Sequence, residues 1–413
     1  MKKYNKNFLG IVGLGYVGLP LALEFSKKKK VIAFDINKKK INKLNKKIKI
    51  KKILFTSDEK KLKSCNIIIV AVPTPIKNSK LPDLSLLKKA CITIANNLSK
   101  DTTIIFESTV YPGCTDEYCM PMIEKISKLK LNKDIFYGYS PERINPGDKS
   151  HTLTKINKLV CGSNIEISKK IKKLYEKIIS SKVHITQSIK IAESAKIIEN
   201  TQRDLNIALI NEFAIILNKL KIDTKKVIDA ASTKWNFHLF RPGLVGGHCV
   251  GVDPYYLTYK AKKIGINPKV ILAGRKINDN MGRYIFSEIK KLSKNKKIDL
   301  NKSRVLILGF AFKENCEDIR NTKVIDIIKC FAQYKSKIDI YDPMVDQDQL
   351  KKMYKLEKIN KLKKNFYDII IYSVPHKKIH SIGSKKLIQC AKKNKIFFDV
   401  KSALPNHMTD ARL

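Results

Sequence analysis

The stretch GGHCVGVDP at residues 246–254 contains a side chain suited to covalent chemistry, the thiol of Cys249. A glycine pair precedes Cys249 and Asp253 follows it by four residues, and glycine lets a backbone approach a ligand closely. A cysteine in such a position is either a buried, inert hydrophobic residue or a nucleophile. The stretch alone favours the inert interpretation, so the rest of the chain has to decide.

Lys196 and Asn200 form a second candidate pair, because they lie four residues apart in a stretch, 188–220, that holds neither glycine nor proline. We predict one long helix here, about 50 Å long at 1.5 Å per residue. Residues at i and i+4 share a helix face, where a lysine and an amide either stabilise a developing oxyanion or belong to a solvated surface. The helix is apolar on too many sides for solvent, which predicts packing against both domains and a second subunit.

A glycine-rich turn near the N-terminus predicts a dinucleotide site. Gly13, Gly15 and Gly18 form GxGxxG between an apolar strand and a predicted helix at 17–28, and Asp35 ends the next apolar run. The first glycine permits the tight turn, the second admits a pyrophosphate, and the third lets the helix pack on the strand. Asp35 would bind a ribose diol and repel a 2′-phosphate, which favours NAD over NADP.

Three further apolar runs have the composition of buried parallel strands. They lie at residues 65–72, 102–108 and 134–140. Each run ends in a polar or proline-rich turn. Because ligands bind beyond the carboxyl ends of the strands in an open parallel sheet, we expect Thr74, Thr109 and Glu142 to converge on one crevice.

A similar order of strands recurs near the C-terminus, at 303–312, 337–343, 367–375 and 395–402. This part lacks GxGxxG, and we interpret it as a second doubly wound domain that holds a nucleotide in a different manner. Lys313, Asp318 and Arg320 follow its first strand, either as nucleotide contacts or as ordinary loop charges. The predicted fold is therefore α/β, with two doubly wound Rossmann-like domains joined by a long central helix.

The net charge of +46 raises the question of nucleic-acid binding. Lysine dominates and is spread over every segment, and aromatic residues are not interleaved with the basic runs as a single-strand binding groove requires. We interpret the charge as a compositional bias toward Lys, Asn and Ile that produces a basic, solvated surface, and we predict no nucleic-acid partner. A positive field would still attract an anionic substrate.

Cysteine usage and hydropathy predict a soluble, cytoplasmic protein without a membrane partner. The nine cysteines are scattered without a CxxC pair, which predicts neither a disulfide framework nor a metal site. The first residues, MKKYNKNFLGIVGLGYVGLPLALEF, imitate a signal peptide, but glycines at fixed spacing interrupt the apolar part and no cleavage pattern follows. No apolar run approaches the roughly 20 residues that span a bilayer.

Seven motifs in this order resemble those of the nucleotide-sugar 6-dehydrogenases, the UDP-glucose and GDP-mannose dehydrogenase superfamily. They are GLGYVGLP, AVPTP, EST, SPE, the helix with Lys196 and Asn200, GGHC with its aspartate, and AFKENCEDIRNT. The stretches SPERINPGD and RPGLVGGHCVGVDPYYLT are similar to the bacterial branch that oxidises UDP-N-acetylhexosamines for Vi antigen, O-antigen and other surface polysaccharides. Val252 and Pro146 replace a lysine and an acid of the UDP-glucose enzymes, which fits that branch.

The resemblance implies an NAD-dependent enzyme that oxidises the C6 alcohol of UDP-GlcNAc or UDP-GalNAc to a carboxylate, with two hydride transfers to two NAD molecules. Cys249 would be the nucleophile, because an aldehyde can lose a hydride only after something has added to its carbonyl. The thiohemiacetal would collapse to a thioester, which water hydrolyses. The implied partners are the UDP-sugar and further copies of the chain, in a homodimer or a higher homo-oligomer.

The resemblance also assigns supporting roles. Lys196 and Asn200 would stabilise the oxyanion, and Asp253 would handle protons with an ordered water. Glu142 would assist thioester hydrolysis and Thr109 would hold the catalytic water. The implied cofactor contacts are Gly13, Gly15, Tyr16, Val17, Gly18, Asp35, Thr74, Thr109 and Arg320. The implied substrate contacts are Glu142, Arg143, Lys196, Asn200, Phe240, Arg241, Gly246 and Lys313.

Three domains follow from this interpretation: an NAD-binding Rossmann domain at 1–187, a central helical and dimerisation domain with the cysteine loop at 188–290, and a UDP-sugar-binding Rossmann-like domain at 291–413. Two rival functions stay open. One is the oxidation of UDP-glucose or GDP-mannose by the same chemistry. The other is a non-catalytic sensor of NAD and nucleotide sugars that regulates a polysaccharide machine.

Overall fold

The computed structural model describes residues 8–143 and 152–413, and the chain divides into two compact units. The N-terminal unit consists of the chain up to Glu199 together with Tyr255–Asn267. The C-terminal unit consists of Asn200–Pro254 and Pro268–Leu413. The three domains expected from the sequence, with boundaries after residues 187 and 290, stay a prediction.

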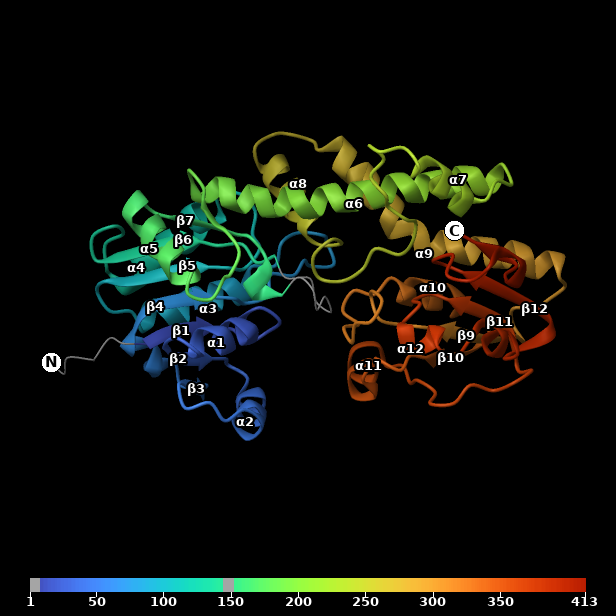
Figure 1. Ribbon diagram of the computed structural model, residues 1–413, viewed down its shortest axis with the longest axis horizontal. Coiled ribbons are helices and arrows are strands. Elements are labelled where there is room, and N and C mark those ends of the chain that lie inside the picture. The colour runs from blue at the N-terminus through green and yellow to red at the C-terminus, as the bar shows by residue number, and fades with distance from the viewer. Residues whose placement is uncertain (1–7, 144–151) are drawn as a thin grey trace. The chain divides into compact units, whose positions relative to one another are not determined.

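An eight-stranded sheet organises the N-terminal unit, in the order β3-β2-β1-β4-β5-β6-β7-β8 (Figure 1). Its strands are β1 (Phe8–Val12), β2 (Lys30–Phe34), β3 (Ile53–Thr56), β4 (Cys65–Val70), β5 (Thr102–Phe106), β6 (Ile135–Tyr139), β7 (Lys158–Gly162) and β8 (Val183–Ile185). Its helices include α1 (Gly18–Ser26), α2 (Lys38–Lys47), α3 (Ser85–Asn96), α4 (Met120–Ser127) and α5 (Ile165–Tyr175). The strand order reverses between β1 and β4, the point at which doubly wound sheets bind ligands.

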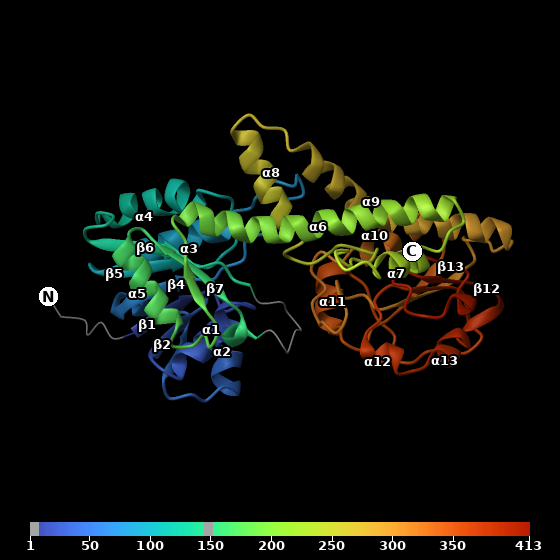
Figure 2. The same ribbon diagram turned by 45° about the horizontal axis from the view of Figure 1, so that its top comes forward.

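The central strands of this sheet are buried on both faces, as their continuous apolar runs predict. Ile69 of β4 and Ile105 of β5 belong to a core that includes Phe25 of α1 and Leu174 of α5. Successive side chains alternate between faces, so the neighbouring buried residues, such as Ile68, point to the opposite side. Figure 2 shows α3 and α4 across the sheet from α1. The predicted doubly wound domain is confirmed.

Strand β7, which the sequence interpretation did not include, runs antiparallel to β6. Gly138 pairs with Gly162, and the backbones meet so closely that a Cβ on Gly138 would lie 2.4 Å from the carbonyl oxygen of Cys161. Because the direction reverses, β7 begins at the edge of the sheet where β5 and β6 end. That edge is the ligand-binding edge of a doubly wound sheet.

Four helices lie in the middle of the chain: α6 (Ile189–Lys219), α7 (Thr224–Ala231), α8 (Asp253–Lys263) and α9 (Lys269–Asn295). The long helix predicted for 188–220 is α6, which is unbroken because no residue in it interrupts the backbone hydrogen bonds (Figure 1). Asp223 caps α7 by accepting a hydrogen bond from the N–H of Lys226, at 3.0 Å. Helix α9 was not anticipated from the sequence. Among the helices of residues 8–143 and 152–413, none combines the length and apolar character of a membrane span.

A five-stranded, fully parallel sheet in the order β10-β9-β11-β12-β13 forms the centre of the C-terminal unit. Its strands are β9 (Arg304–Leu308), β10 (Lys337–Tyr341), β11 (Tyr367–Tyr372), β12 (Ala391–Asp399) and β13 (Ala411–Arg412). Its helices include α10 (Val324–Phe331), α11 (Gln347–Tyr354), α12 (Lys377–His380) and α13 (Ser384–Ile388). Helices α9 and α10 pack on one face and α12 and α13 on the other (Figure 2), so the second predicted doubly wound domain is confirmed.

Candidate active site

The glycine turn after β1 has the geometry of a pyrophosphate site. Gly13 has φ +91°, and a Cβ there would lie 2.9 Å from the carbonyl oxygen of Ala71. A Cβ on Gly18 would lie 1.8 Å from the carbonyl oxygen of Gly13, so α1 can approach the turn only with glycine. Gly15 is different, because a Cβ there would meet no atom within 4 Å. The first and third glycines therefore serve packing, and the second borders open space at the N-terminus of α1, as NAD binding requires.

Asp35 is hydrogen-bonded to the backbone of this turn. Its carboxylate accepts hydrogen bonds from the N–H groups of Leu14 and Asn37, each at 3.0 Å, and forms an ion pair with Lys40 at 3.0 Å. Burial by itself would raise the pKa of Asp35, but these three partners lower it below its ordinary value. The group is therefore an anion beside the glycine turn at neutral pH, as a ribose-binding acid must be. Of the two residues between the glycines, Tyr16 is exposed and Val17 is half-buried.

The ends of β4, β5 and β6 carry the next group of predicted residues. The Thr74 side chain donates a hydrogen bond to the backbone carbonyl oxygen of Thr109 at 2.6 Å, so these two residues are in contact. The convergence of Thr74, Thr109 and Glu142 on one crevice stays a prediction. Glu142 follows β6 and is 8% exposed. Its Oε1 accepts a hydrogen bond from the N–H of Arg143 at 2.5 Å, and the Arg143 guanidinium approaches Glu199 at 3.4 Å. Residues 144–148 of SPERINPGD, Pro146 among them, lie outside the described residues.

Lys158 forms an ion pair with Glu142, although the sequence interpretation had not selected this lysine. The antiparallel register of β6 and β7, continued by three residues beyond the pair of Tyr139 and Cys161, sets Lys158 opposite Glu142. The Lys158 Nζ lies 3.6 Å from the Glu142 Oε2. The same ammonium contacts Glu107 at 2.8 Å, and Tyr175 donates a hydrogen bond to Glu107. Burial opposes the charge of Lys158, but the two carboxylates prevail and raise its pKa. Burial raises the pKa of Glu107 to about 7.

Helix α6 presents Lys196 and Asn200 one turn apart, and both are buried, at 8% and 3% exposure. A solvated surface position is therefore excluded for the pair. Asn200 donates a hydrogen bond from Nδ2 to Oδ2 of Asp253, the first residue of α8, at 2.5 Å. An amide that an aspartate holds in this way has a defined orientation, with its second N–H available for an oxyanion.

Cys249 lies in the turn directly before α8. Its carbonyl oxygen accepts hydrogen bonds from the N–H groups of Val252 and Asp253, at 2.9 and 2.8 Å. Of the nine free cysteines, seven are buried, whereas Cys249 and Cys330 are half-buried. The Sγ of Cys249 lies 2.9 Å from Nδ1 of His248. A partly exposed thiol with a polar partner, on a turn, does not have the environment of an inert core cysteine.

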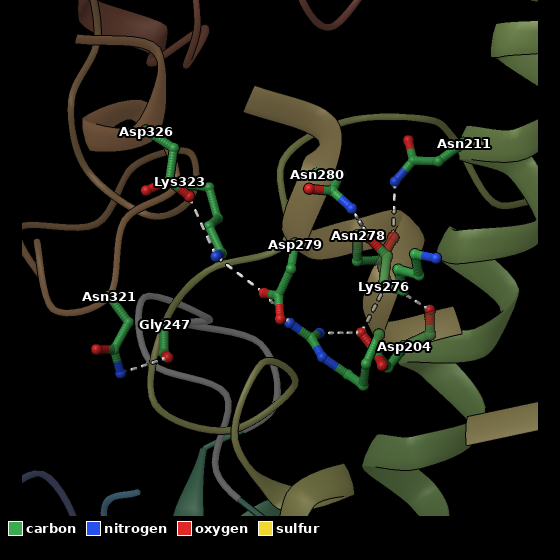
Figure 3. Close-up of polar contacts among 11 residues, drawn as sticks. Asp204, Asn211, Gly247, Lys276, Asn278, Asp279, Asn280, Asn321, Lys323 and Asp326 are labelled. Atoms are coloured by element: carbon green, nitrogen blue, oxygen red, sulfur yellow. Dashed lines mark hydrogen bonds and ion pairs between the residues drawn. The ribbon is translucent and has the colours of Figure 1, made fainter. Parts of the chain in front are cut away.

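The turn before the cysteine requires glycine at positions 246 and 247, because it packs closely against the loop after β9. A Cβ on Gly246 would lie 2.6 Å from the carbonyl oxygen of Asn321. Gly247 has φ +85°, and a Cβ there would lie 2.7 Å from the ring of Phe312. Asn321 donates a hydrogen bond from Nδ2 to the carbonyl oxygen of Gly247 at 3.1 Å (Figure 3). The position of Cys249 is thus set by residues some seventy positions later in the chain.

A second anchor holds the cysteine loop at Gly243. The Asn211 side chain of α6 accepts from the N–H of Gly243 at 2.8 Å and donates to its carbonyl oxygen at 3.0 Å. Asn211 also donates to Asn278 of α9 at 2.8 Å (Figure 3). Sequence reasoning missed Asn211, Asn278 and Asn321, because nothing in their local sequence distinguishes them from ordinary helix and loop amides.

The remaining predicted substrate residues occupy loops. Phe240 is half-buried, and Arg241 forms an ion pair with Asp229 of α7 at 2.8 Å. In the loop after β9, the ammonium of Lys313 lies 5.7 Å from the ring centre of Phe312, and Arg320 forms an ion pair with Asp318 at 2.6 Å. The predicted roles of these residues toward substrate and cofactor stay predictions.

Family models for the three parts of the UDP-glucose/GDP-mannose dehydrogenase family match this chain in order. The NAD binding domain matches residues 8–179, the central domain residues 190–280, and the UDP binding domain residues 306–406. These matches confirm the resemblance expected from the motifs and the expected cofactor, NAD.

The chain is similar over almost its whole length to characterised proteins. It is 48% identical to a UDP-N-acetyl-D-glucosamine 6-dehydrogenase of Salmonella typhi, over 98% of each chain. It is 47% identical to protein CapL of Staphylococcus aureus, over 97% of this chain and 96% of CapL. The solved structure of a UDP-D-ManNAc dehydrogenase from Pyrococcus horikoshii covers 98% of each chain with a TM-score of 0.88 at 27% identity.

Proposed function

This chain belongs to the UDP-glucose/GDP-mannose dehydrogenase family, and on that premise we propose that it oxidises the C6 hydroxymethyl group of UDP-N-acetylglucosamine to the carboxylate. The UDP-N-acetyl-D-glucosamine 6-dehydrogenase of Salmonella typhi, identical at 48% of positions, supports this substrate. The product would be a UDP-activated aminouronate, which a glycosyl transfer reaction can consume. We place that reaction in the synthesis of a surface polysaccharide.

Cys249 is the proposed nucleophile. Its thiolate adds to the C6 carbonyl of the aldehyde that the first oxidation produces, and a thiohemiacetal forms. Loss of the hydride from C6 and of the proton from the C6 hydroxyl leaves a thioester on Sγ, and water cleaves the thioester to the acid and the free thiol. NAD, when bound, would supply the hydride acceptor, and two NAD molecules in succession would serve the two oxidations.

Four other side chains support these steps. Lys196 and Asn200 stabilise negative charge on the C6 oxygen, the lysine by its charge and the asparagine by an N–H that Asp253 orients. Asp253 exchanges protons with water beside the same oxygen. Glu142, held between Arg143 and Lys158, acts on the water that hydrolyses the thioester.

One observation carries the proposal: a half-buried thiol lies in a glycine-dependent turn directly before α8, and the first residue of that helix binds the buried Asn200. A non-catalytic sensor has no need for a buried amide oriented by a carboxylate next to an accessible cysteine.

The yield of NADH per sugar tests the proposal. We expect about two NADH for each UDP-GlcNAc consumed, because a thioester route removes four electrons. UDP-GalNAc, UDP-glucose and GDP-mannose are compared in the same assay, with UDP-GlcNAc expected to give the highest kcat/KM. A yield of one NADH per sugar would contradict the thioester route, and faster turnover of UDP-glucose would contradict the proposed substrate alone.

We also propose that the enzyme is a homo-oligomer that associates through α6. Leu209, Phe213, Ile216 and Leu220 are 45–61% exposed, and their spacing of four, three and four residues places them in one stripe along the helix. An apolar stripe of this kind is unfavourable in water and suits a second copy of the same helix.

Phe213→Glu is expected to convert the oligomer into monomer, because a charge in the middle of the stripe must be desolvated on association. Lys219→Glu is the matched control, since Lys219 is exposed but lies off the stripe. Sedimentation velocity measures both. An oligomer that Phe213→Glu leaves intact at micromolar concentration would show that association uses another surface.

We further propose a cytoplasmic location. All nine cysteines are free thiols, and the mechanism needs Cys249 in its reduced form.

A further inference from the structure

His248 and Asp318 extend Cys249 into a Cys-His-Asp arrangement within the C-terminal unit. The Sγ of Cys249 lies 2.9 Å from Nδ1 of His248, and the other ring nitrogen, Nε2, lies 3.6 Å from Oδ2 of Asp318. Asp318 is buried, at 4% exposure, and the His248 side chain is 26% exposed. The ring edge of His248 packs against Phe312, with 6.0 Å between ring centres. The order of a thiol, an imidazole and a carboxylate is that of an activated nucleophile, its base and an orienting group.

Asp318 is held firmly as the third member. The Arg320 guanidinium binds both its oxygens, from Nε at 3.0 and 3.1 Å and from Nη2 at 2.6 Å. The N–H of Arg320 adds a further hydrogen bond to Oδ1 at 3.0 Å. Burial alone would raise the pKa of Asp318, but the hydrogen bonds from Arg320 lower it below its ordinary value. A permanent carboxylate therefore faces the Nε2 side of the imidazole.

We propose that His248 is the base that takes the proton of the Cys249 thiol, and that Asp318 is a positioning residue that orients the imidazole and stabilises its charged form. The S–H bond breaks, its electron pair stays on Sγ, and a bond forms between the proton and Nδ1, so nothing is oxidised or reduced. For this transfer the neutral ring carries its proton on Nε2, toward Asp318, and the unprotonated Nδ1 is the acceptor. The inference rests on the proposed function, because it assigns Cys249 as the nucleophile.

Three other charged groups on the adjoining elements have partners of their own. Arg320 binds Asp318, Lys313 lies over the ring of Phe312, and Asp253 binds Asn200. The proposed base, His248, is thus the sequence neighbour of Cys249. The carboxylate that stabilises the charged form of His248, Asp318, comes from the loop after β9.

The alkylation rate of Cys249 as a function of pH tests this proposal without substrate or cofactor. The protein is treated with iodoacetamide between about pH 5 and pH 9, and each cysteine-containing peptide is quantified by mass spectrometry. A thiolate beside an imidazolium reacts at low pH, so we expect a midpoint below about 7, against about 8.5 for a free cysteine. Cys330, half-buried and with its pKa raised by burial, is the internal reference in every sample.

In His248→Asn the midpoint for Cys249 should move to about 8.5, and the rate at pH 6.5 should fall by about tenfold or more, while Cys330 reacts as before. His238→Asn, which changes an exposed histidine of the same irregular segment, is the matched control and should leave the profile unchanged. Asp318→Asn should give an intermediate midpoint. Equal melting temperatures of the two histidine variants establish that the fold is retained.

A wild-type midpoint near 8.5, or a profile that His248→Asn leaves unchanged, would overturn the role of His248. A profile that Asp318→Asn leaves unchanged would overturn the role of Asp318. Neither result bears on the proposed function, which fails separately if the wild-type protein produces no NADH from UDP-GlcNAc, whereas acid formation at the wild-type rate by Cys249→Ser would contradict Cys249 as the nucleophile.

Discussion

Cys249→Ser is expected to lower the formation of the sugar acid by about a thousandfold or more. A serine hydroxyl is a far weaker nucleophile than a thiolate at neutral pH and leaves less readily from the ester that would follow. NAD binding should persist, because the glycine turn and Asp35 are held by contacts within the N-terminal unit. Acid is quantified by liquid chromatography with mass spectrometry, and NAD affinity by calorimetry.

Cys330→Ser provides the matched control for this experiment, since Cys330 is the other half-buried thiol and lies on α10. It should retain acid formation within a few-fold. Undiminished acid formation by Cys249→Ser would refute the thiohemiacetal route and would show that Cys249 is not the nucleophile.

Arg275→Met is expected to lower the free energy of unfolding by about 3–5 kcal/mol, because it leaves the buried carboxylate of Asp204 without its counter-ion. Arg275 of α9 is 2% exposed and contacts Asp204 of α6 and Asp279, each at 2.6 Å. A Cβ on Gly274 would lie 2.5 Å from the side chain of Leu205, so α9 and α6 pack closely beside this ion pair. Urea denaturation measures the effect, with Arg283→Met, at an exposed position of α9, as the control.

The loss of stability should be smaller near pH 5 than near pH 7.5. Burial already raises the pKa of Asp204 in spite of Arg275, and removal of the guanidinium raises it further. A carboxyl whose folded pKa is raised contributes stability at low pH that is lost as the pH rises, because the charged form is the one penalised. A loss below about 1 kcal/mol that does not depend on pH would show that Asp204 does not need its counter-ion.

This ion pair belongs to the framework behind the cysteine loop. Asp279 also contacts Lys323 at 2.9 Å, and Asn321, two residues before Lys323, binds Gly247 (Figure 3). Arg275→Met should therefore also reduce kcat, since Asn321 depends on a framework that the substitution loosens.

The sequence by itself determined the features that depend on short stretches of chain. The apolar runs predicted the two doubly wound sheets, because strands buried on both faces need no polar alternation. The absence of glycine and proline predicted α6, and GxGxxG followed by Asp35 predicted the cofactor turn. Cys249, Lys196 and Asn200 were found as candidates, but their neighbours alone left the inert and solvated interpretations open.

Tertiary structure excluded a solvated position for Lys196 and Asn200 and left Cys249 half-buried, because burial and partner distance depend on residues remote in the chain. Asn200 is buried against Asp253, Glu142 meets Lys158 only through the antiparallel register of β6 and β7, and Asp318 reaches His248 from the loop after β9. Strand direction and helix packing leave no local signal in the residues that they bring together. The sequence thus specified which groups are available for chemistry, and the fold specified which of them act on one another, since a proton or charge interaction requires contact within a few ångströms.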